Sequence, residues 1–335
     1  MAKFKVLSLG RNFTDSLDPE RGELASVKGD VEVVLARCTT EDQLIEAARD
    51  ADAILGGSPL FTRRVMGSLP KCKVIVTYSV GYDTLDVEAA TENGIIIVNN
   101  PSPEWCVEEV ANHTIALILI CAKKLGLMNE LTKQARWADA KRAIPTADPV
   151  HGQTLGLIGC GNIGRLVAKK AQVFGLRVLG CDPYVKKPLA QEAGIALVSQ
   201  PTLLKESDFV SLHTPLTKET RHFMGEAQFS QMKPSAYLIN TSRGPVVDEA
   251  ALVKALQGKR IAGAGLDVFE KEPVSPDNPL LKMDNVVAIP HTASTSTSAL
   301  LRQPVNPSQE VARVLSGKWP KNVVNKGVEP RVRLT

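Results

Sequence analysis

A glycine-rich turn in the middle of the chain restricts the fold more than any other feature. The segment TLGLIGCGNIGRLVAKKAQVFG joins an apolar run to a helical pattern through Gly159, Gly161 and Gly164. In such a strand-turn-helix the first glycine permits the tight turn, the second lets the backbone approach a pyrophosphate, and the third allows close helix-strand packing. The turn therefore predicts a parallel sheet with helices on both faces and a dinucleotide bound at the helix N-terminus.

An acidic residue stands where this turn needs one. Asp182 ends the next apolar run, LRVLGCD, 21 positions after Gly161. A carboxylate there can accept hydrogen bonds from the adenosine ribose hydroxyls and repels a 2′-phosphate. The spacing therefore predicts NAD as cofactor in preference to NADP.

Two series of short apolar runs indicate two α/β domains, which a chain of 335 residues can accommodate. The first series is FKVLSLG, VEVVLAR, DAILGG, KVIVTYS and GIIIVNN, with helical segments between the runs. The second is TLGLIG, LRVLGCD, DFVSLHT, AYLINTS, IAGAGLDVF and NVVAIP, six strands in all. Continuous apolar strands alternating with helices are typical of parallel sheets. One long helix is expected between the series, over residues 103–125.

Composition excludes several other classes of protein. The formal net charge is +4 and the basic pairs lie far apart, so no nucleic-acid partner is expected. Six cysteines without CxxC spacing or clustering with histidine indicate unpaired thiols in a reducing compartment and no metal site. The N-terminal apolar run is too short for a signal sequence, and the apolar stretch 115–122 is too short to span a membrane. We therefore expect a soluble cytoplasmic protein without a membrane partner.

Three later segments carry an arginine, a glutamate and a histidine that follow predicted strands: INTSRGPVVDE with Arg243, GLDVFEKEP with Glu272, and IPHTAS with His291. Arginine binds a carboxylate bidentately and stays cationic. Histidine can donate a proton near neutral pH, and a neighbouring carboxylate favours its protonated form. Glu270, two positions away, is the alternative partner for the histidine.

Together these motifs resemble the D-isomer-specific 2-hydroxyacid dehydrogenases. The resemblance runs from CTTEDQLIEAARDADAIL through TYSVGYDTLDVEAATENGI to WPKNVVN, and CVEEVANHTIALIL is most similar to the branch of C-terminal-binding-protein corepressors and phosphoglycerate-dehydrogenase-like enzymes. It implies a Rossmann-type NAD-binding domain, residues 102–293, inserted into a discontinuous flavodoxin-like substrate-binding domain, residues 1–101 and 294–335. It also implies a homodimer, with the active site in the cleft between the domains.

The resemblance implies a role for each candidate residue. Arg243, Glu272 and His291 would be catalytic, with Arg243 also binding the substrate carboxylate together with the loop Ser79, Val80 and Gly81. The cofactor would be bound by Gly159, Gly161, Asn162, Ile163, Gly164, Asp182, His213, Thr214, Pro215, Thr241 and Asp267. His113 and His222 are interpreted as structural.

The predicted activity is interconversion of a D-2-hydroxy acid and its 2-keto acid by hydride transfer with NAD. One alternative is an NAD(H)-sensing binding protein similar to the corepressors, although the chain lacks long disordered arms. Another is a dehydrogenase of a small anion such as phosphite. Glu272 argues against formate, since formate dehydrogenases resemble this pattern with glutamine at that position.

Two prolines predict a departure from the family. Pro304 and Pro307 interrupt LLRQPVNPSQEVARVL, where relatives have one continuous helix. Proline inside a helix removes a hydrogen-bond donor and clashes with the preceding turn. We therefore expect two helical pieces, with a break near residues 303–308.

Overall fold

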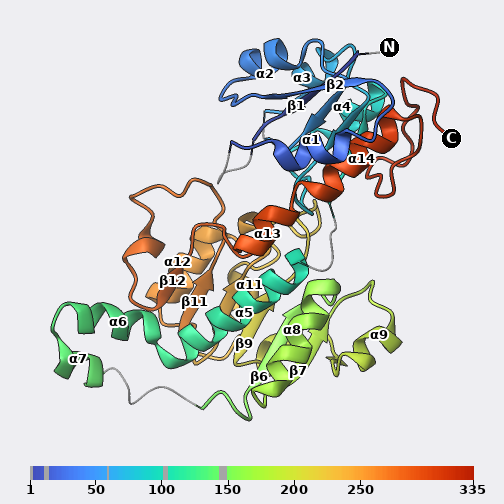
Figure 1. Ribbon diagram of the computed structural model, residues 1–335. Coiled ribbons are helices and arrows are strands. Elements are labelled where there is room, and N and C mark those ends of the chain that lie inside the picture. The colour runs from blue at the N-terminus through green and yellow to red at the C-terminus, as the bar shows by residue number, and fades with distance from the viewer. Residues whose placement is uncertain (1–2, 11–14, 59, 101–104, 143–148) are drawn as a thin grey trace. The chain divides into compact units, whose positions relative to one another are not determined.

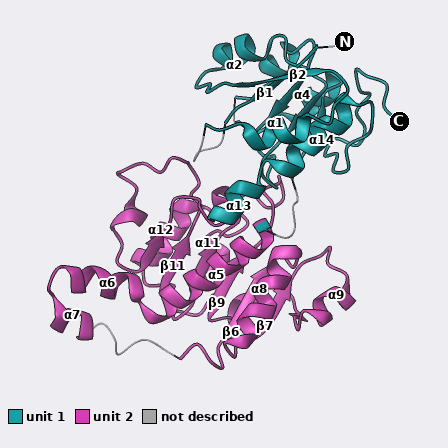
Figure 2. Cartoon of the chain, viewed as in Figure 1, with its two compact units in different colours: residues 1–105, 296–335 teal, residues 106–295 magenta. Residues whose placement is uncertain are grey.

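The computed structural model describes residues 3–10, 15–58, 60–100, 105–142 and 149–335. It divides into two compact units (Figure 2). Unit 1 is residues 1–105 together with 296–335, and unit 2 is residues 106–295. Unit 2 is thus an insertion in the sequence of unit 1.

Unit 1 carries both ends of the chain (Figure 1). It contains a parallel sheet whose five described strands follow the order β2-β1-β3-β4-β5, the flavodoxin-like order. All five strands predicted for the first series are present. They are β1 (Lys3–Ser8), β2 (Asp30–Leu35), β3 (Ala53–Leu55), β4 (Val74–Val76) and β5 (Ile96–Val98).

Helices cover both faces of this sheet because successive residues of its strands point to opposite sides. On one face Val6 packs in a cluster with Val311 of the last helix. On the other face its neighbour Leu7 packs with Leu44. The helices of unit 1 are α1 (Asp18–Leu24), α2 (Glu41–Ala48), α3 (Arg63–Gly67), α4 (Val87–Glu92), α13 (Thr297–Arg302) and α14 (Val305–Leu315).

The break expected at the prolines is confirmed. The helix α13 ends at Arg302, Pro304 caps α14, and Pro307 lies in the first turn of α14. A proline is tolerated there because the first N–H groups of a helix have no intrahelical acceptor. The first main-chain bond of α14 runs from Ser308 N–H to Pro304 O over 3.0 Å.

Unit 2 contains a second parallel sheet, with the order β12-β11-β10-β9-β6-β7-β8 among the described residues. This is the dinucleotide-binding order 3-2-1-4-5-6 with one further strand. The predicted count of six was one too low, because β8 is two exposed residues at the sheet edge and has no apolar run. The strands are β6 (Thr154–Ile158), β7 (Arg177–Cys181), β8 (Ala196–Leu197), β9 (Phe209–Leu212), β10 (Tyr237–Asn240), β11 (Gly263–Leu266) and β12 (Val286–Ala288).

The helices of unit 2 pack on both faces of this sheet. Residues of α5 and α8 form one apolar cluster with β6, and residues of α10 and α12 form another on the opposite face. Two short 3-10 helices are also present: η2 (Gly244–Val246) follows β10, and η3 (Pro279–Lys282) precedes β12. The helices are α5 (Trp105–Lys123), α6 (Leu125–Lys133), α7 (Trp137–Arg142), α8 (Asn162–Val173), α9 (Lys187–Glu192), α10 (Gln200–Glu206), α11 (Glu226–Phe229) and α12 (Glu249–Gln257).

Helix α5 is the core helix of unit 2. By length and composition alone this helix could cross a membrane. The sequence did not predict this, because the most apolar stretch, residues 115–122, is much shorter than the helix. More than half of it is buried, however, and Ile115, Ile118 and Cys121 pack against Leu155 and Leu157 of β6. Its apolar character is thus explained by contact with the sheet.

Candidate active site

Most of the candidate residues of unit 2 follow the carboxyl ends of its parallel strands. Because these ends meet at one edge of the sheet, residues far apart in sequence are brought to the same edge, where such sheets bind ligands. The residues are Gly159 after β6, Asp182 after β7, His213 after β9, Thr241 and Arg243 after β10, Asp267 after β11 and His291 after β12.

The glycine turn has the shape that a pyrophosphate requires. Gly161 caps the N-terminus of α8, and Asn162 and Ile163 form its first turn with Gly164. A Cβ at Gly161 would meet nothing within 4 Å, so the backbone is open there. A Cβ at Gly164 would lie 2.3 Å from the carbonyl oxygen of Gly159, so only glycine allows helix and turn to pack this closely. The turn therefore fits NAD phosphates at the N–H groups of α8.

Asp182 has a second role that the spacing did not reveal. One carboxylate oxygen accepts the Cys160 N–H at 2.7 Å, and the other accepts the N–H groups of Tyr184 at 2.7 Å and Val185 at 3.1 Å. The side chain thus ties the glycine turn to the end of β7. A carboxylate offers about four acceptor sites, so capacity for a ribose hydroxyl remains.

The segment His213, Thr214 and Pro215 follows β9 beside the glycine turn. The His213 N–H donates to Ile158 O at 2.8 Å, and the His213 carbonyl lies against Gly159. Burial lowers the pKa of His213 to about 4, so its ring is neutral at neutral pH. The ring is 3.0 Å from Ser211 Oγ, which fixes its orientation.

His291 and Glu272 form a direct pair. His291 Nδ1 is 2.7 Å from Glu272 Oε2, and the other oxygen of Glu272 accepts the Phe269 N–H at 3.0 Å. Because an ionised carboxylate only accepts, Nδ1 carries the proton and Nε2 is left for a substrate. Glu270 instead binds His222, at 2.6 Å, so the alternative partner is engaged elsewhere.

The charges around His291 favour its protonated form. The hydrogen bond to Glu272 raises the pKa of His291, against burial and the positive charge of Arg243. Burial alone would raise the pKa of Glu272, but the hydrogen bonds from His291 and from the Phe269 N–H lower it. The pair therefore favours the charged imidazolium and carboxylate forms, which provide a proton for transfer.

The backbone at His291 is held in an unusual conformation. Its φ of 53° is left-handed, which is uncommon for a residue with a side chain. The His291 N–H donates to Asp267 O at 2.7 Å, and this hydrogen bond helps to hold the backbone in that conformation. The direction of the imidazole is thus determined by the segment that follows β12.

Arg243 and Thr241 follow β10. Arg243 Nη1 donates to Ser242 O at 2.7 Å, and the Arg243 carbonyl accepts a hydrogen bond from Asn240 Nδ2 at 3.0 Å. Thr241 Oγ1 is 2.9 Å from Thr114 Oγ1 of α5, a buried contact. The half-buried guanidinium therefore stands on a rigid turn and affects the pKa of both His291 and Glu272.

The loop Ser79, Val80 and Gly81 belongs to unit 1 and follows β4. Its carbonyl groups accept hydrogen bonds from within unit 1. The Ser79 carbonyl accepts from Thr77 Oγ1 and from the Asn100 N–H. The Val80 carbonyl accepts from Asn99 Nδ2, and the Gly81 carbonyl accepts from Ser79 Oγ. Ser79 and Val80 are exposed. No acceptor for the N–H groups of these three residues is found among the described parts of the chain, so they can bind an anion.

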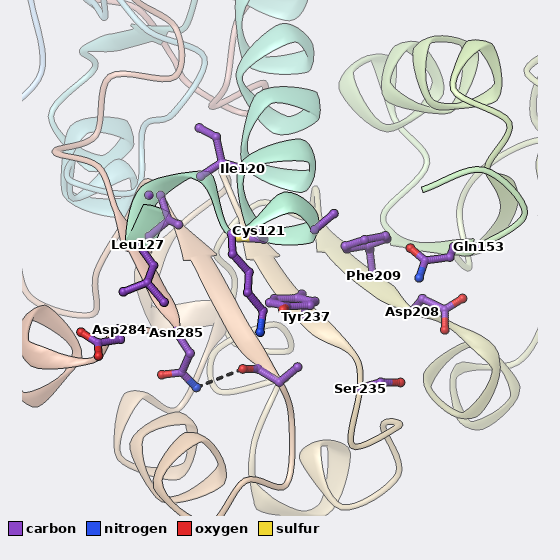
Figure 3. A pocket seen from close by; sticks show the side chains of 15 residues that line it. Ile120, Cys121, Leu127, Gln153, Asp208, Phe209, Ser235, Tyr237, Asp284 and Asn285 are labelled. Carbon is purple, nitrogen blue, oxygen red and sulfur yellow. Dashed lines mark hydrogen bonds between the residues drawn. The ribbon is translucent and has the colours of Figure 1, made fainter. Parts of the chain in front are cut away.

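A hollow in unit 2 lies at the opposite edge of the sheet, away from this chemistry. It measures about 490 Å³ and is bordered by the amino ends of β9 and β10, with Phe209 and Tyr237, and by α5 and α6, with Cys121 and Leu127 (Figure 3). Within the described ranges, no three His, Cys, Asp or Glu side chains are grouped as metal ligands would be.

Comparisons with known proteins agree with this geometry. The family model for the NAD binding domain of D-isomer specific 2-hydroxyacid dehydrogenases matches residues 115–293. A glyoxylate reductase from Korarchaeum cryptofilum is 40% identical over 316 residues, covering 92% of this chain and 94% of that protein. The chain belongs to the D-isomer specific 2-hydroxyacid dehydrogenase family. The predicted α/β fold, family, enzyme class and NAD cofactor are confirmed.

Other relatives have different substrates in their names. A D-3-phosphoglycerate dehydrogenase from Methanocaldococcus jannaschii is 39% identical, and the match covers 96% of this chain but only 60% of that protein. The crystal structure of a D-lactate dehydrogenase from Aquifex aeolicus, complexed with NAD and lactic acid, is 30% identical with a TM-score of 0.81, covering 96% of this chain and 99% of that one. The family relationship alone thus leaves the substrate open.

Two glycine substitutions should separate folding from cofactor binding. Gly164→Ala places a methyl group against the Gly159 carbonyl, so both the melting temperature and NADH affinity should fall. Gly161→Ala meets no protein atom and should leave the melting temperature within about 2 °C while weakening NADH binding roughly tenfold or more. Thermal melts and NADH fluorescence titrations measure both effects. Full NADH affinity in Gly161→Ala would exclude the turn as the phosphate site.

Removing the Asp182 carboxylate should relax discrimination against NADP. Asp182→Ser loses the negative charge that repels a 2′-phosphate, and it also frees the glycine turn from β7. The NAD/NADP ratio of kcat/KM should fall by about tenfold or more, and NAD affinity should fall with it. An unchanged ratio would contradict the assignment.

Proposed function

We propose that this chain reduces a small 2-keto acid to the D-2-hydroxy acid with NADH, and catalyses the reverse oxidation, with His291 as the acid/base. The main support is the 2.7 Å bond between His291 Nδ1 and Glu272, next to the positive charge of Arg243. A cation to bind the carboxylate and a protonated imidazole to supply a proton are the two groups that the reduction requires.

Each residue has a defined task in this proposal. Arg243 binds the substrate carboxylate and polarises the carbonyl. The N–H groups of Ser79, Val80 and Gly81 in unit 1 are assigned to substrate binding. When bound, NADH supplies the hydride. His291 donates the proton on Nε2 to the oxygen that becomes the hydroxyl, while Glu272 stabilises the charged ring before transfer.

The remaining candidates orient the cofactor. We assign the phosphates to the glycine turn with Asn162 and Ile163, and the adenosine ribose to Asp182. The nicotinamide end is assigned to Thr241, Asp267 and the segment 213–215. In this scheme unit 2 is the NAD-binding domain, predicted from the sequence as residues 102–293. Unit 1 is the substrate-binding domain, predicted as residues 1–101 and 294–335. Six free thiols fit a cytoplasmic enzyme.

Glyoxylate or a substrate of similar size is the proposed keto acid. The chain covers nearly the whole length of the Korarchaeum protein named glyoxylate reductase. Two relatives named D-3-phosphoglycerate dehydrogenase are 39% and 37% identical. NADH oxidation with glyoxylate, hydroxypyruvate, pyruvate, phenylpyruvate and 3-phosphohydroxypyruvate distinguishes these substrates.

The acid/base assignment predicts two different effects. His291→Gln should lower kcat for the best keto acid by roughly 100-fold or more and leave NADH binding nearly intact. Glu272→Gln should shift the histidine limb of the pH profile to lower pH, because Glu272 raises the pKa of His291 and its removal lowers it. Stopped-flow and steady-state pH profiles measure both effects.

Arg243→Ala serves as the contrasting variant. It should raise KM for the keto acid and also lower kcat, since the cation contacts both the ground state and the transition state. A fully active His291→Gln, together with a Glu272→Gln profile that superimposes on wild type, would remove the pair from the mechanism.

We further propose that the chain forms a homodimer through unit 2. Helices α6 and α7 extend away from its sheet (Figure 1), and they expose Leu125 and Trp137. The hollow described above is bordered by Gly126 and Leu127 of α6. A second copy covering this surface would remove large apolar side chains from water.

Sedimentation velocity at micromolar concentration should therefore give about twice the mass of the 36.1 kDa chain. Trp137→Ser combined with Leu125→Ser should shift the protein toward monomer. Val173→Ser, at an even more exposed apolar residue at the end of α8, is the control and should stay dimeric. A wild-type monomer at that concentration would refute the dimer.

A further inference from the structure

His113, interpreted as structural in the sequence, lies next to a candidate site residue. It is in α5, and its Nε2 is 3.5 Å from Oδ1 of Asp267. That nitrogen is buried and has no hydrogen-bond partner among the described residues. A buried polar atom without a hydrogen-bond partner is rare in native structures. The nearby carboxylate of Asp267 is therefore the candidate acceptor for this nitrogen.

Asp267 holds the segment that carries His291. Its side chain is fully buried, and its two oxygens accept the N–H groups of Thr292 at 2.8 Å and Ala293 at 2.9 Å. The Asp267 carbonyl accepts the His291 N–H at 2.7 Å. The position of His291 therefore depends on this carboxylate.

We propose that His113 is a positioning residue: its Nε2–H donates to Asp267 Oδ1, keeps that carboxylate ionised, and so holds residues 291–293 in place for proton transfer. The inference rests on the proposed role of His291. It extends that role to a helix that begins far away in the sequence.

The physical reason is the cost of a buried charge. An isolated carboxylate in a dry site tends to take up a proton. Burial raises the pKa of Asp267, whereas the N–H groups of Thr292 and Ala293 and the nearby rings of His113 and His291 lower it. A protonated Asp267 would lose acceptor capacity for the two N–H groups and loosen their segment.

The charged groups around Asp267 come from several elements. His113 faces it from α5 and His291 from the segment after β12. Glu272 raises the pKa of His291, and Arg243, which follows β10, lowers it. Removing His113 therefore removes one of the two rings that lower the pKa of Asp267, and it leaves the pair of His291 with Glu272 in place.

Hydrogen exchange provides a test without substrate. In His113→Leu, exchange at the amides of Thr292 and Ala293 should become about tenfold faster, because their acceptor is weakened. His113→Gln places an amide nitrogen near the former Nε2 and should restore wild-type exchange. His113→Asn has the same group on a shorter side chain and should resemble His113→Leu. Equal exchange in all four proteins would overturn the proposal.

The pH profile gives a second readout. Because His113 lowers the pKa of Asp267, His113→Leu should move the acid limb of kcat/KM to higher pH, and kcat should fall more than KM rises. His113→Gln should keep the wild-type limb. An acid limb that stays in place in His113→Leu would contradict the role through Asp267.

A double-mutant cycle tests whether the two residues act together. In an Asp267→Asn background, His113→Leu should have little further effect on kcat or on exchange. Additive losses would show that His113 acts elsewhere and would overturn the proposal. Since exchange needs no substrate, it reports on His113 even if Glu272→Gln and His291→Gln disprove the proposed chemistry.

Discussion

The buried carboxylate of Asp267 is the contact on which the arrangement of the site depends. It follows β11, accepts two N–H groups from the segment after β12, and lies close to α5. Three separate elements thereby meet around one buried carboxyl group. Because the group is out of water, each of these contacts is stronger than it would be at the surface, and the loss of any one is correspondingly costly.

Parallel topology explains how so many functional groups reach one place. Each strand of unit 2 runs in the same direction, so the residue just beyond its end lies at the same edge as all the others. The glycine turn, Asp182, Arg243 and His291 are positioned by strand ends rather than by long loops. Such a scaffold holds side chains within the small tolerances that hydride and proton transfer demand.

Much of this was predictable because the local signals are strong. Gly161 and Gly164 are required by shape, and the apolar runs predicted eleven strands that the structure contains. The short strand β8 was missed because two exposed residues carry no apolar pattern. The contacts of Asp182 with the glycine turn, and of His113 with Asp267, were also missed. They join residues through tertiary packing, and residue type and spacing do not encode that packing.

The discontinuity of unit 1 affects how the chain can fold as it is synthesised. Val311 and Leu315 of α14 complete one apolar face of its sheet, and Asn325 binds the backbone of Ile95 and Ile97. The first hundred residues therefore leave the ribosome without part of their own core. Unit 2 is continuous and can close its core first. Until the last segment emerges, the N-terminal sheet exposes an apolar face that a chaperone can recognise.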